Sequence, residues 1–286
     1  MIKAENVNYI YQHGTPFARQ ALYDINLEIP DDSLTAIIGH TGSGKSTLIQ
    51  HFNALIKPTS GKIEINGIDV TNPKADLTLI RRTSGLVFQY PEHQLFEETV
   101  YKDIAFAPKN MGLNEKEIDE RVKESAAMAG LSEKYLERSP FELSGGQKRR
   151  AAIAGVLAMK PKVLILDEPT AGLDPKGRDE ILNTIKVLHK TNREMIILFV
   201  SHSMEDVAKT AEHIIVMNKG HIEMQGSTAE IFTRAEYLRQ IGLNVPQITL
   251  LCDKLRNAGI NLPDNIYTVH DAAKAIAPLM GGGRNV

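Results

Sequence analysis

Hydrophobic positions alternate with polar ones in some stretches of this chain and form short unbroken runs in others. The stretch LYDINLEI alternates, which predicts a strand with one buried face. The runs LTAIIG, VLILD and MIILFV are each about as long as a strand that is buried on both faces. Two further segments, KIEINGIDV and HIIVMNKGHIEMQG, place Asn66-Gly67 and Lys219-Gly220 between apolar stretches, and we predict a hairpin at each.

Helical spacing of the apolar residues dominates the segments between these strands. STLIQHFNALI, which follows LTAIIG after a glycine-rich turn, predicts one helix. From about 91 to 160 the signal persists, with helices expected over 99–107 and 115–129 and continuing into LSEKYLE. Another helix is expected over 177–189. Because the block at 91–160 interrupts the alternation of strands and helices, we interpret it as a helical subdomain inserted into an α/β domain.

The last sixty or so residues differ from the rest of the chain because they carry helical signals only. Ser227 and Glu230 have the spacing of a capping box at the start of a short helix. A second helix is predicted over 246–258, with an apolar stripe that must be buried against this chain or a partner, and a third over 271–280. The stripe consists of Ile248, Leu251 and Leu255.

We therefore divide the chain into a main unit, 1–226, and a C-terminal helical extension, 227–286, whose tail GGGRNV we expect to be disordered. Of the 286 residues, 42% are hydrophobic, which is ordinary for a globular protein with a real core. The formal net charge of -2 gives no basic excess that would favour a nucleic-acid binder. The single cysteine, Cys252, leaves no internal disulfide. We find no signal-peptide pattern and no apolar run long enough to cross a bilayer.

The first chemical motif lies between LTAIIG and the helix that follows it. Residues 39–47, GHTGSGKST, match the phosphate-loop pattern GxxxxGK[ST]. Glycines let successive backbone N–H groups point at phosphate oxygens, and the helix start adds its positive dipole end. Lys45 would reach the β- and γ-phosphates, and Ser46 would offer a hydroxyl to Mg²⁺. The predicted nucleotide-binding residues are Gly39, His40, Thr41, Gly42, Ser43, Gly44, Lys45, Ser46 and Thr47.

The second motif is the apolar run VLILD followed by a second acid. A parallel strand that ends in acids presents carboxylates at the carboxyl edge of the sheet, where ligands bind. Asp167 would hold Mg²⁺ through water, and Glu168 would polarise the attacking water. A strand ending in Asp-Glu is common and often only caps a helix, but its position downstream of a phosphate loop favours the functional interpretation.

The third motif, LSGGQ at 143–147, precedes a helical segment. Ser144 is a good N-cap residue, and Gly145 and Gly146 expose the backbone amides of the first turn. With Gln147 they form a second helix start that suits an anion. Taken alone, the motif favours a helix that is simply capped.

In this order, the three motifs resemble the nucleotide-binding domain of ABC transporters, whose LSGGQ signature is matched in full. The resemblance covers about residues 1–226. It implies an α/β fold of the P-loop NTPase (ABC ATPase) type, with a RecA-like core, an antiparallel β subdomain and the inserted helical subdomain. The C-terminal helical extension is an addition to that fold.

The resemblance also implies roles for further residues. Gln89 is similar to the Q-loop glutamine, which reaches the metal and the attacking water, and His202 to the switch histidine, which contacts the γ-phosphate. Asp174 is similar to the D-loop aspartate that helps couple two subunits. Glu168, Gln89 and His202 would then be catalytic. The metal set for Mg²⁺ would be Ser46, Gln89 and Asp167.

An aromatic residue stacks on the adenine of ATP in this family. Tyr11 is our choice for that role, but Tyr9 lies two positions away and would face the same side of a strand. In the family, ATP is held between the phosphate loop of one subunit and the signature of another. Residues 144–147 would therefore serve the ATP of a partner subunit, and hydrolysis would remove the bridge between the two.

The segment FQYPEHQLFEETVYKDIAFAPKNMG resembles the ATPases of energy-coupling factor importers, especially the second ATPase of the heteromeric vitamin-type pair. This implies a paralogous ATPase partner, a transmembrane coupling subunit that docks near Gln89–Phe96, and a substrate-binding membrane subunit. The location would be peripheral, on the cytoplasmic face of the cell membrane. The extension over 227–286 would be a dimerisation element, and the cargo a vitamin or related micronutrient.

Three alternatives stay open from the sequence. A metal-ion (cobalt or nickel) importer of the same type, or another ABC importer, would use the same motifs. A soluble ABC ATPase acting on nucleic acid is disfavoured because there is one cassette, no extended heptad pattern and no basic excess. A degenerate subunit that binds ATP without cleaving it is disfavoured because all the motif residues are present.

Overall fold

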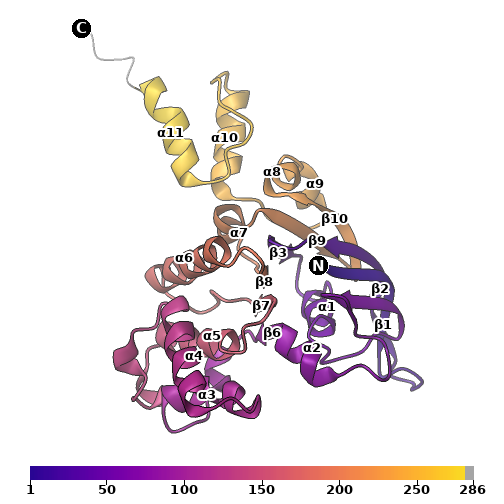
Figure 1. Ribbon diagram of the computed structural model, residues 1–286. Helices are drawn as coiled ribbons and strands as arrows, with labels where there is room; N and C mark the ends of the chain where they lie inside the picture. Colours follow the sequence, from indigo (N-terminus) through magenta and orange to yellow (C-terminus); the bar gives the residue numbers. More distant parts are fainter. Residues whose placement is uncertain (281–286) are drawn as a thin grey trace.

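The computed structural model describes residues 1–280 as two β-sheets surrounded by helices (Figure 1). The tail at 281–286, for which we predict disorder, lies outside the described residues. The larger sheet has the strand order β10-β9-β3-β8-β7-β6, and the smaller has the order β2-β1-β4-β5. The strands are β1 (Ile2–Tyr11), β2 (Arg19–Ile29), β3 (Leu34–Ile38), β4 (Ser60–Ile65), β5 (Ile68–Asp69), β6 (Ser84–Val87), β7 (Val163–Asp167), β8 (Ile196–Val200), β9 (His213–Asn218) and β10 (His221–Ser227).

The helices fall into a group around the larger sheet and a group at the C-terminal end. The first group is α1 (Lys45–His51), α2 (Leu77–Thr83), α3 (Val100–Asn110), α4 (Glu115–Met128), α5 (Gly145–Leu157), α6 (Pro175–Thr191) and α7 (Met204–Thr210), with the short 3-10 turns η1 (Pro91–Gln94), η2 (Glu133–Tyr135) and η3 (Pro140–Glu142). The second group is α8 (Thr228–Phe232), α9 (Ala235–Gln240), α10 (Gln247–Asn257) and α11 (Val269–Met280).

The larger sheet is parallel from β6 to β9, and only β10 runs antiparallel, as the second strand of a hairpin with β9. Both of its faces are covered, which explains why its strands are unbroken apolar runs. Along β8, Ile197 and Phe199 join one hydrophobic core, while Ile196 and Leu198 join a second core on the opposite face. The first core also contains residues of α3–α7, and the second contains α1 and the smaller antiparallel sheet.

The hairpins form where the sequence predicts them. Asn66 and Gly67 between β4 and β5 both have positive φ, as do Lys219 and Gly220 between β9 and β10. At the start of α4, Asn114 and Glu117 bond each other's backbone in a capping box, as Ser227 and Glu230 do at the start of α8, where the sequence predicts one. The start of α4 within the inserted helical block is therefore encoded locally.

Two predicted helices end earlier than expected. The helix after the phosphate loop stops at His51, because Ala54 adopts a left-handed φ of 52° and turns the chain; Leu55 is consequently 42% exposed. LSEKYLE does not continue α4, because Gly130 ends that helix with a φ of 69°. Only the short turn η2 forms there. The sequence patterns also gave no prediction of α2 or α7.

The C-terminal segment consists of two parts that pack differently. Helices α8 and α9 bury Ile231, Phe232 and Leu238 in the first core of the main unit. Helices α10 and α11 instead form a small cluster of their own around Cys252 and project from the molecule (Figure 1). In the predicted stripe of α10, Ile248 and Leu255 pack against that cluster, whereas Leu251 is 47% exposed.

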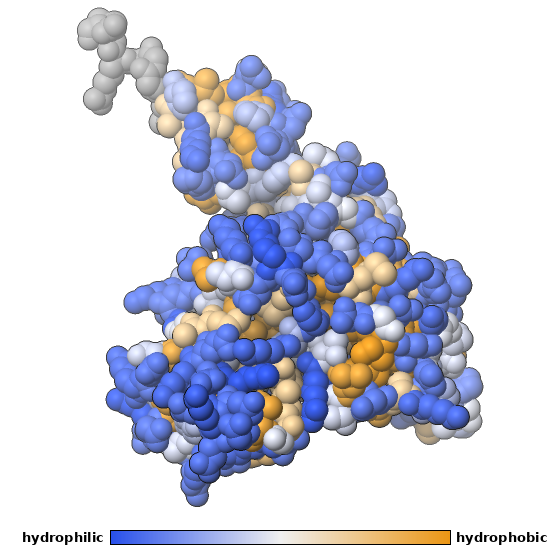
Figure 2. All heavy atoms as spheres, in the orientation of Figure 1, coloured by the Kyte–Doolittle hydropathy of each residue, from blue (hydrophilic) through white to orange (hydrophobic). Residues whose placement is uncertain are grey.

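Hydrophobic side chains are visible on the surface of the projecting pair α10–α11 (Figure 2). None of the helices within residues 1–280 combines the length and hydrophobicity that spanning a bilayer needs.

Candidate functional site

The predicted site residues gather because they follow strands of one parallel sheet. Gln89 follows β6, Glu168 follows β7, His202 follows β8, and the phosphate loop follows β3. Neighbouring parallel strands end at the same edge, so residues far apart in sequence are brought together there.

The phosphate loop between β3 and α1 depends on glycine at two points. A Cβ at Gly39 would lie 2.4 Å from the carbonyl oxygen of Met217 and 2.5 Å from Ser43 Oγ, so no larger residue fits. Gly44 has a left-handed φ of 101° and forms the N-cap of α1, with no side-chain cap on the helix start. The loop therefore holds its backbone amides in a curl that suits phosphate oxygens.

Lys45 is almost completely buried within this loop, at 5% exposed. Its Nζ donates to the carbonyl oxygens of Gly39, at 2.8 Å, and His40, at 3.0 Å. Burial lowers the pKa of the ammonium group, and the carboxylates of Glu168 and Asp167 oppose that shift. The lysine thus stays folded against the loop with the acids of β7 nearby.

Three residues from three different strand ends meet at Glu168. Gln89 Nε2 donates to Glu168 Oε2 over 3.0 Å, and His202 Nε2 lies 2.7 Å from Glu168 Oε1. Glu168 itself has a left-handed φ of 48°, and its N–H donates to the carbonyl oxygen of Val200, at 3.1 Å. The predicted catalytic set is therefore one contiguous cluster.

Asp167, the last residue of β7, lies between this cluster and the phosphate loop. Burial and the adjacent Glu168 charge raise its carboxyl pKa, while a hydrogen bond with Ser46 and the charge of Lys45 act in the opposite direction. The Ser46–Asp167 contact joins the first residues of α1 to the end of β7. Two of the three residues that the sequence analysis assigned to Mg²⁺, Ser46 and Asp167, are thus already in contact.

A cavity of about 710 Å³ opens beside the phosphate loop. Tyr11 lines it, together with Gly42, Gly44, Lys45 and other residues of the loop. Tyr9 does not line it, but packs against the second core and touches the rings of Tyr11 and His51 edge-on, each at 4.8 Å. The two tyrosine rings lie in contact, as expected for residues two positions apart on one face of a strand, and Tyr11 is the one of the two that lines the cavity.

Tyr11 is also fixed at its polar end. Its hydroxyl lies 3.0 Å from Thr47 Oγ1, and the side chain is 40% exposed. On the other side of the loop, His40 Nε2 lies 3.1 Å from Asn218 Oδ1 at the end of β9. Asn218 belongs to no motif in the sequence, and only its place at the end of an apolar strand could have pointed to it.

The signature residues lie apart from this cavity, at the start of α5 in the helical block. Ser144 Oγ accepts a hydrogen bond from the N–H of Gln147, at 3.4 Å, and Gln147 Oε1 accepts one from the N–H of Ser144, at 2.9 Å. None of residues 144–147 lines the cavity that contains Lys45. Asp174 caps α6 by accepting a hydrogen bond from Gly177, at 3.0 Å.

Sequence reasoning missed a group of buried polar residues next to this site. Arg149 and Asp206 are each only 2% exposed, and Arg178 forms an ion pair with Asp206 at 2.6 Å. In the sequence, these residues could have been found only by their proximity to the motifs. Arg149 follows the LSGGQ signature by two residues, and Asp206 follows His202 by four.

Known proteins match the chain over its full length. The model of the family described as "ABC transporter" matches residues 22–171. The "Energy-coupling factor transporter ATP-binding protein EcfA2" of Caldanaerobacter subterraneus subsp. tengcongensis is 58% identical over 285 residues, which is 100% of this chain and 99% of that protein. The protein of the same description from Clostridium perfringens is 57% identical, covering 98% of each.

Solved structures agree with these relatives. The structure of cbiO1 from Clostridium perfringens, described as part of the ABC transporter complex cbiONQ, has a TM-score of 0.75 at 41% identity and covers 88% of this chain and 98% of that one. A dimeric ATP-binding cassette in a post-hydrolysis state with ADP and Pi has a TM-score of 0.71 at 31% identity, covering 80% of this chain and 99% of that one. The predicted α/β fold of the ABC ATPase type is confirmed. The chain therefore belongs to the ABC transporter family, as an ATP-binding protein and ATPase of the energy-coupling factor type.

Proposed function

We propose that this chain hydrolyses ATP at the cluster of Gln89, Glu168 and His202, and thereby drives an importer of vitamins or related micronutrients. The observation that carries the proposal is the contact of Glu168 with both Gln89, at 3.0 Å, and His202, at 2.7 Å. A carboxylate held between an amide and an imidazole beside a phosphate loop is well placed to orient a water molecule for attack on the γ-phosphate. Glu168 polarises the water, Gln89 orients it, and His202 contacts the γ-phosphate.

ATP lies along the cavity beside the phosphate loop in this proposal. The amides of residues 39–44 bind phosphate oxygens, and Lys45 leaves its two carbonyl partners to reach the β- and γ-phosphates. Tyr11 stacks on the adenine, since it lines the cavity and Tyr9 does not.

The residues beside the loop fit Mg²⁺. Ser46 offers a hydroxyl, Asp167 a carboxylate, and Gln89 an amide oxygen, because its nitrogen is engaged with Glu168. These are hard oxygen ligands of the kind that Mg²⁺ takes alongside phosphates and water. When bound, the ion would neutralise charge on the phosphate groups.

The ATP site is complete only across a dimer. Ser144, Gly145, Gly146 and Gln147 serve the ATP of a partner, and Asp174 faces the partner's site. Supporting this, the signature residues do not line this chain's own loop cavity, and the solved cassette with ADP and Pi is dimeric. The partner is a paralogous ATPase, and the C-terminal extension, residues 227–286, contributes to dimerisation through its projecting helices.

A transmembrane coupling subunit docks on the segment Gln89–Phe96. Tyr90 and Phe96 are 53% and 62% exposed there. A cavity of about 190 Å³ beside them is lined by Leu95, Phe96 and Phe106, with Asp103 among its walls. Asp103 Oδ2 is buried without a hydrogen-bond partner in the described part of the chain, so the groove suits an apolar helix that carries a donor.

The complex also contains a substrate-binding membrane subunit, and the chain is peripheral on the cytoplasmic face of the cell membrane. The vitamin-type proposal is supported by the resemblance of the segment FQYPEHQLFEETVYKDIAFAPKNMG to the second ATPase of vitamin-type pairs. A metal-ion importer is the second candidate, because an importer of that kind would use the same motifs. Extraction of the native complex in mild detergent, with identification of its subunits and bound cargo, separates the two.

The test of the catalytic cluster is Glu168→Gln in the purified complex. The variant should bind ATP with wild-type affinity, accumulate the closed dimer and hydrolyse ATP at least about 100-fold more slowly, because the side chain keeps its size but loses its basicity. Phosphate release and ATP binding are measured side by side. Wild-type turnover by this variant would remove Glu168 from the proposed role.

A further inference from the structure

Asp206 is a buried carboxylate that the proposed chemistry does not use. It lies in the first turn of α7, four residues after His202, and is 2% exposed. An acid at this position often serves only the helix start. Here, however, Ser203 Oγ already caps α7 by accepting from the N–H of Asp206, at 3.2 Å. The carboxylate itself is turned to other segments.

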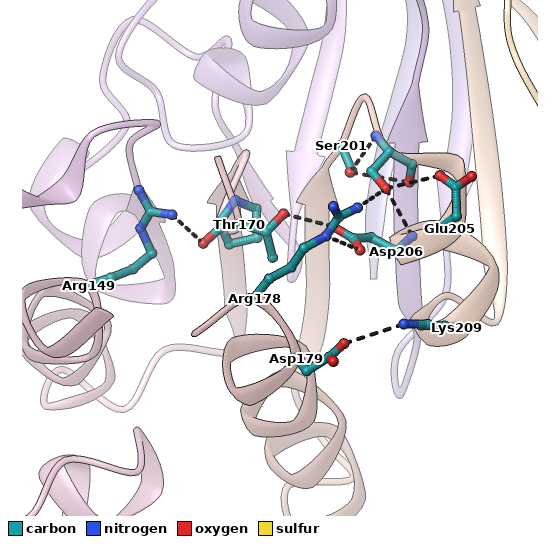
Figure 3. Close-up of polar contacts among 10 residues, drawn as sticks. Arg149, Thr170, Arg178, Asp179, Ser201, Glu205, Asp206 and Lys209 are labelled. Carbon is teal, nitrogen blue, oxygen red and sulfur yellow. Dashed lines mark hydrogen bonds and ion pairs between the residues drawn. The ribbon is translucent and has the colours of Figure 1, made fainter. Parts of the chain in front are cut away.

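Both carboxylate oxygens are bonded to residues that flank the D-loop, which we define as 171–174. Thr170 Oγ1 donates to Asp206 Oδ2, at 2.8 Å, and Arg178 Nε donates to Asp206 Oδ1, at 2.6 Å (Figure 3). Arg178 Nη2 also donates to Ser203 Oγ, in the turn that carries His202. One carboxylate thus joins Thr170, just before the D-loop, and Arg178, on α6 after it, to the segment of the switch histidine.

The same D-loop is attached to the signature helix on its other side. Arg149 Nη1 donates to the carbonyl oxygens of Pro169, at 2.8 Å, and Ala171, at 2.9 Å. Arg149 belongs to α5, which begins at the signature. Figure 3 shows the resulting order of groups: Arg149 from α5, then the segment of Thr170, then Arg178 and Asp206. Segments joined by buried hydrogen bonds of this kind move together, because separating them would leave a buried polar group without a partner.

We propose that Asp206 is a positioning residue that couples the D-loop to His202, so that the two ATP sites of the dimer act cooperatively. The inference rests on the proposed function, in which the signature and D-loop serve the partner's ATP while His202 serves this chain's own. Closure on the partner's nucleotide moves α5 and the D-loop together. The Thr170–Asp206 bond then carries that movement to the turn that holds His202.

The test uses Thr170→Val in this chain of the purified complex, because valine matches threonine in shape and removes only the hydroxyl that bonds Asp206. We expect kcat for ATP to fall about three- to tenfold, the range for loss of one buried hydrogen bond. KM for ATP should stay unchanged, and the Hill coefficient for ATP should fall toward 1. Thr170→Ser keeps the hydroxyl and should restore both kcat and the Hill coefficient.

Thr184→Val is the matched control, since Thr184 lies on α6 and its hydroxyl only donates to the carbonyl oxygen of Glu180, at 3.0 Å. It should leave kcat and the Hill coefficient at wild-type values. A Thr170→Val variant that loses thermal stability but keeps both kinetic parameters overturns the inference and leaves Asp206 a purely structural group. A wild-type complex that does not hydrolyse ATP overturns the proposed function and the inference together, so the two failures are distinguishable.

Discussion

The phosphate loop and the signature both form glycine-rich helix starts, but their backbone donors are in different states. The start of α1 has glycine as its N-cap and no side chain bonded to its amides. The start of α5 is closed on itself by the reciprocal bonds of Ser144 and Gln147. The loop is therefore prepared for phosphate by its own chain. The signature must break the hydrogen bonds between Ser144 and Gln147 before it can bind a ligand. This is consistent with a ligand that arrives with another subunit.

The largest effect that this comparison predicts is at Lys45, because the phosphate loop binds ATP without a partner subunit, whereas the signature does not. Lys45→Ala should raise the dissociation constant for ATP about 10- to 100-fold, the range for loss of a charge-assisted hydrogen bond. Binding is measured by calorimetry on the full chain. Lys116→Ala, at a side chain that is 87% exposed, is the control and should bind as wild type does. Equal affinities for the two variants would break the comparison.

A smaller effect is expected at the signature. Ser144→Ala and Asn114→Ala each remove one half of a capping box, on α5 and α4 respectively, so both should lose about 1 kcal/mol of stability. Only Ser144→Ala should also weaken ATP-driven dimer closure, by about fivefold if one hydrogen bond to the nucleotide is lost. Light scattering in the Glu168→Gln background measures closure. Equal closure in both variants would mean that Ser144 is only a cap.

The smallest effect concerns the stability of the nucleotide-free site. Burial and Glu168 raise the pKa of Asp167 above its unfolded value, so the folded chain binds more protons between the two values and loses stability as pH rises through that window. Above that pH window, the full loss of folding stability caused by the raised pKa of Asp167 is present. Asp167→Asn removes it, and the midpoint of thermal unfolding should rise by a few °C at pH 7.

The higher unfolding midpoint of Asp167→Asn should disappear as pH falls below the ordinary aspartate pKa, about 3.9, because residue 167 is then neutral in the wild type as well as in the variant. The exposed Asp179 gives a control variant, Asp179→Asn, which should show no such gain. A wild-type chain that is more stable than Asp167→Asn at pH 7 contradicts the prediction.

The phosphate loop, the two acids at the end of β7 and the signature could be predicted because each is a contiguous motif at the end of an apolar strand or the start of a helix. The cluster at Glu168 follows from the same logic, since parallel strands share an edge. The hairpins at Asn66 and Lys219 are likewise local. In all of these cases, a few neighbouring residues determine the geometry.

The network of Arg149, Thr170, Arg178 and Asp206 could not be predicted in this way. Its bonds join residues that are 20 to 36 positions apart, and none of its members has a motif of its own. The early end of α1 depended on Ala54 taking a left-handed conformation that alanine rarely adopts.

The left-handed backbone of Glu168 has a consequence for how such a protein can evolve. A residue with a Cβ at φ 48° is strained by roughly 1 kcal/mol relative to glycine. Glycine at this position would relieve the strain and give a sturdier chain that has lost its acid. A screen that rewards heat tolerance alone would therefore tend to recover inert variants here, and only a screen that also demands turnover would retain the glutamate.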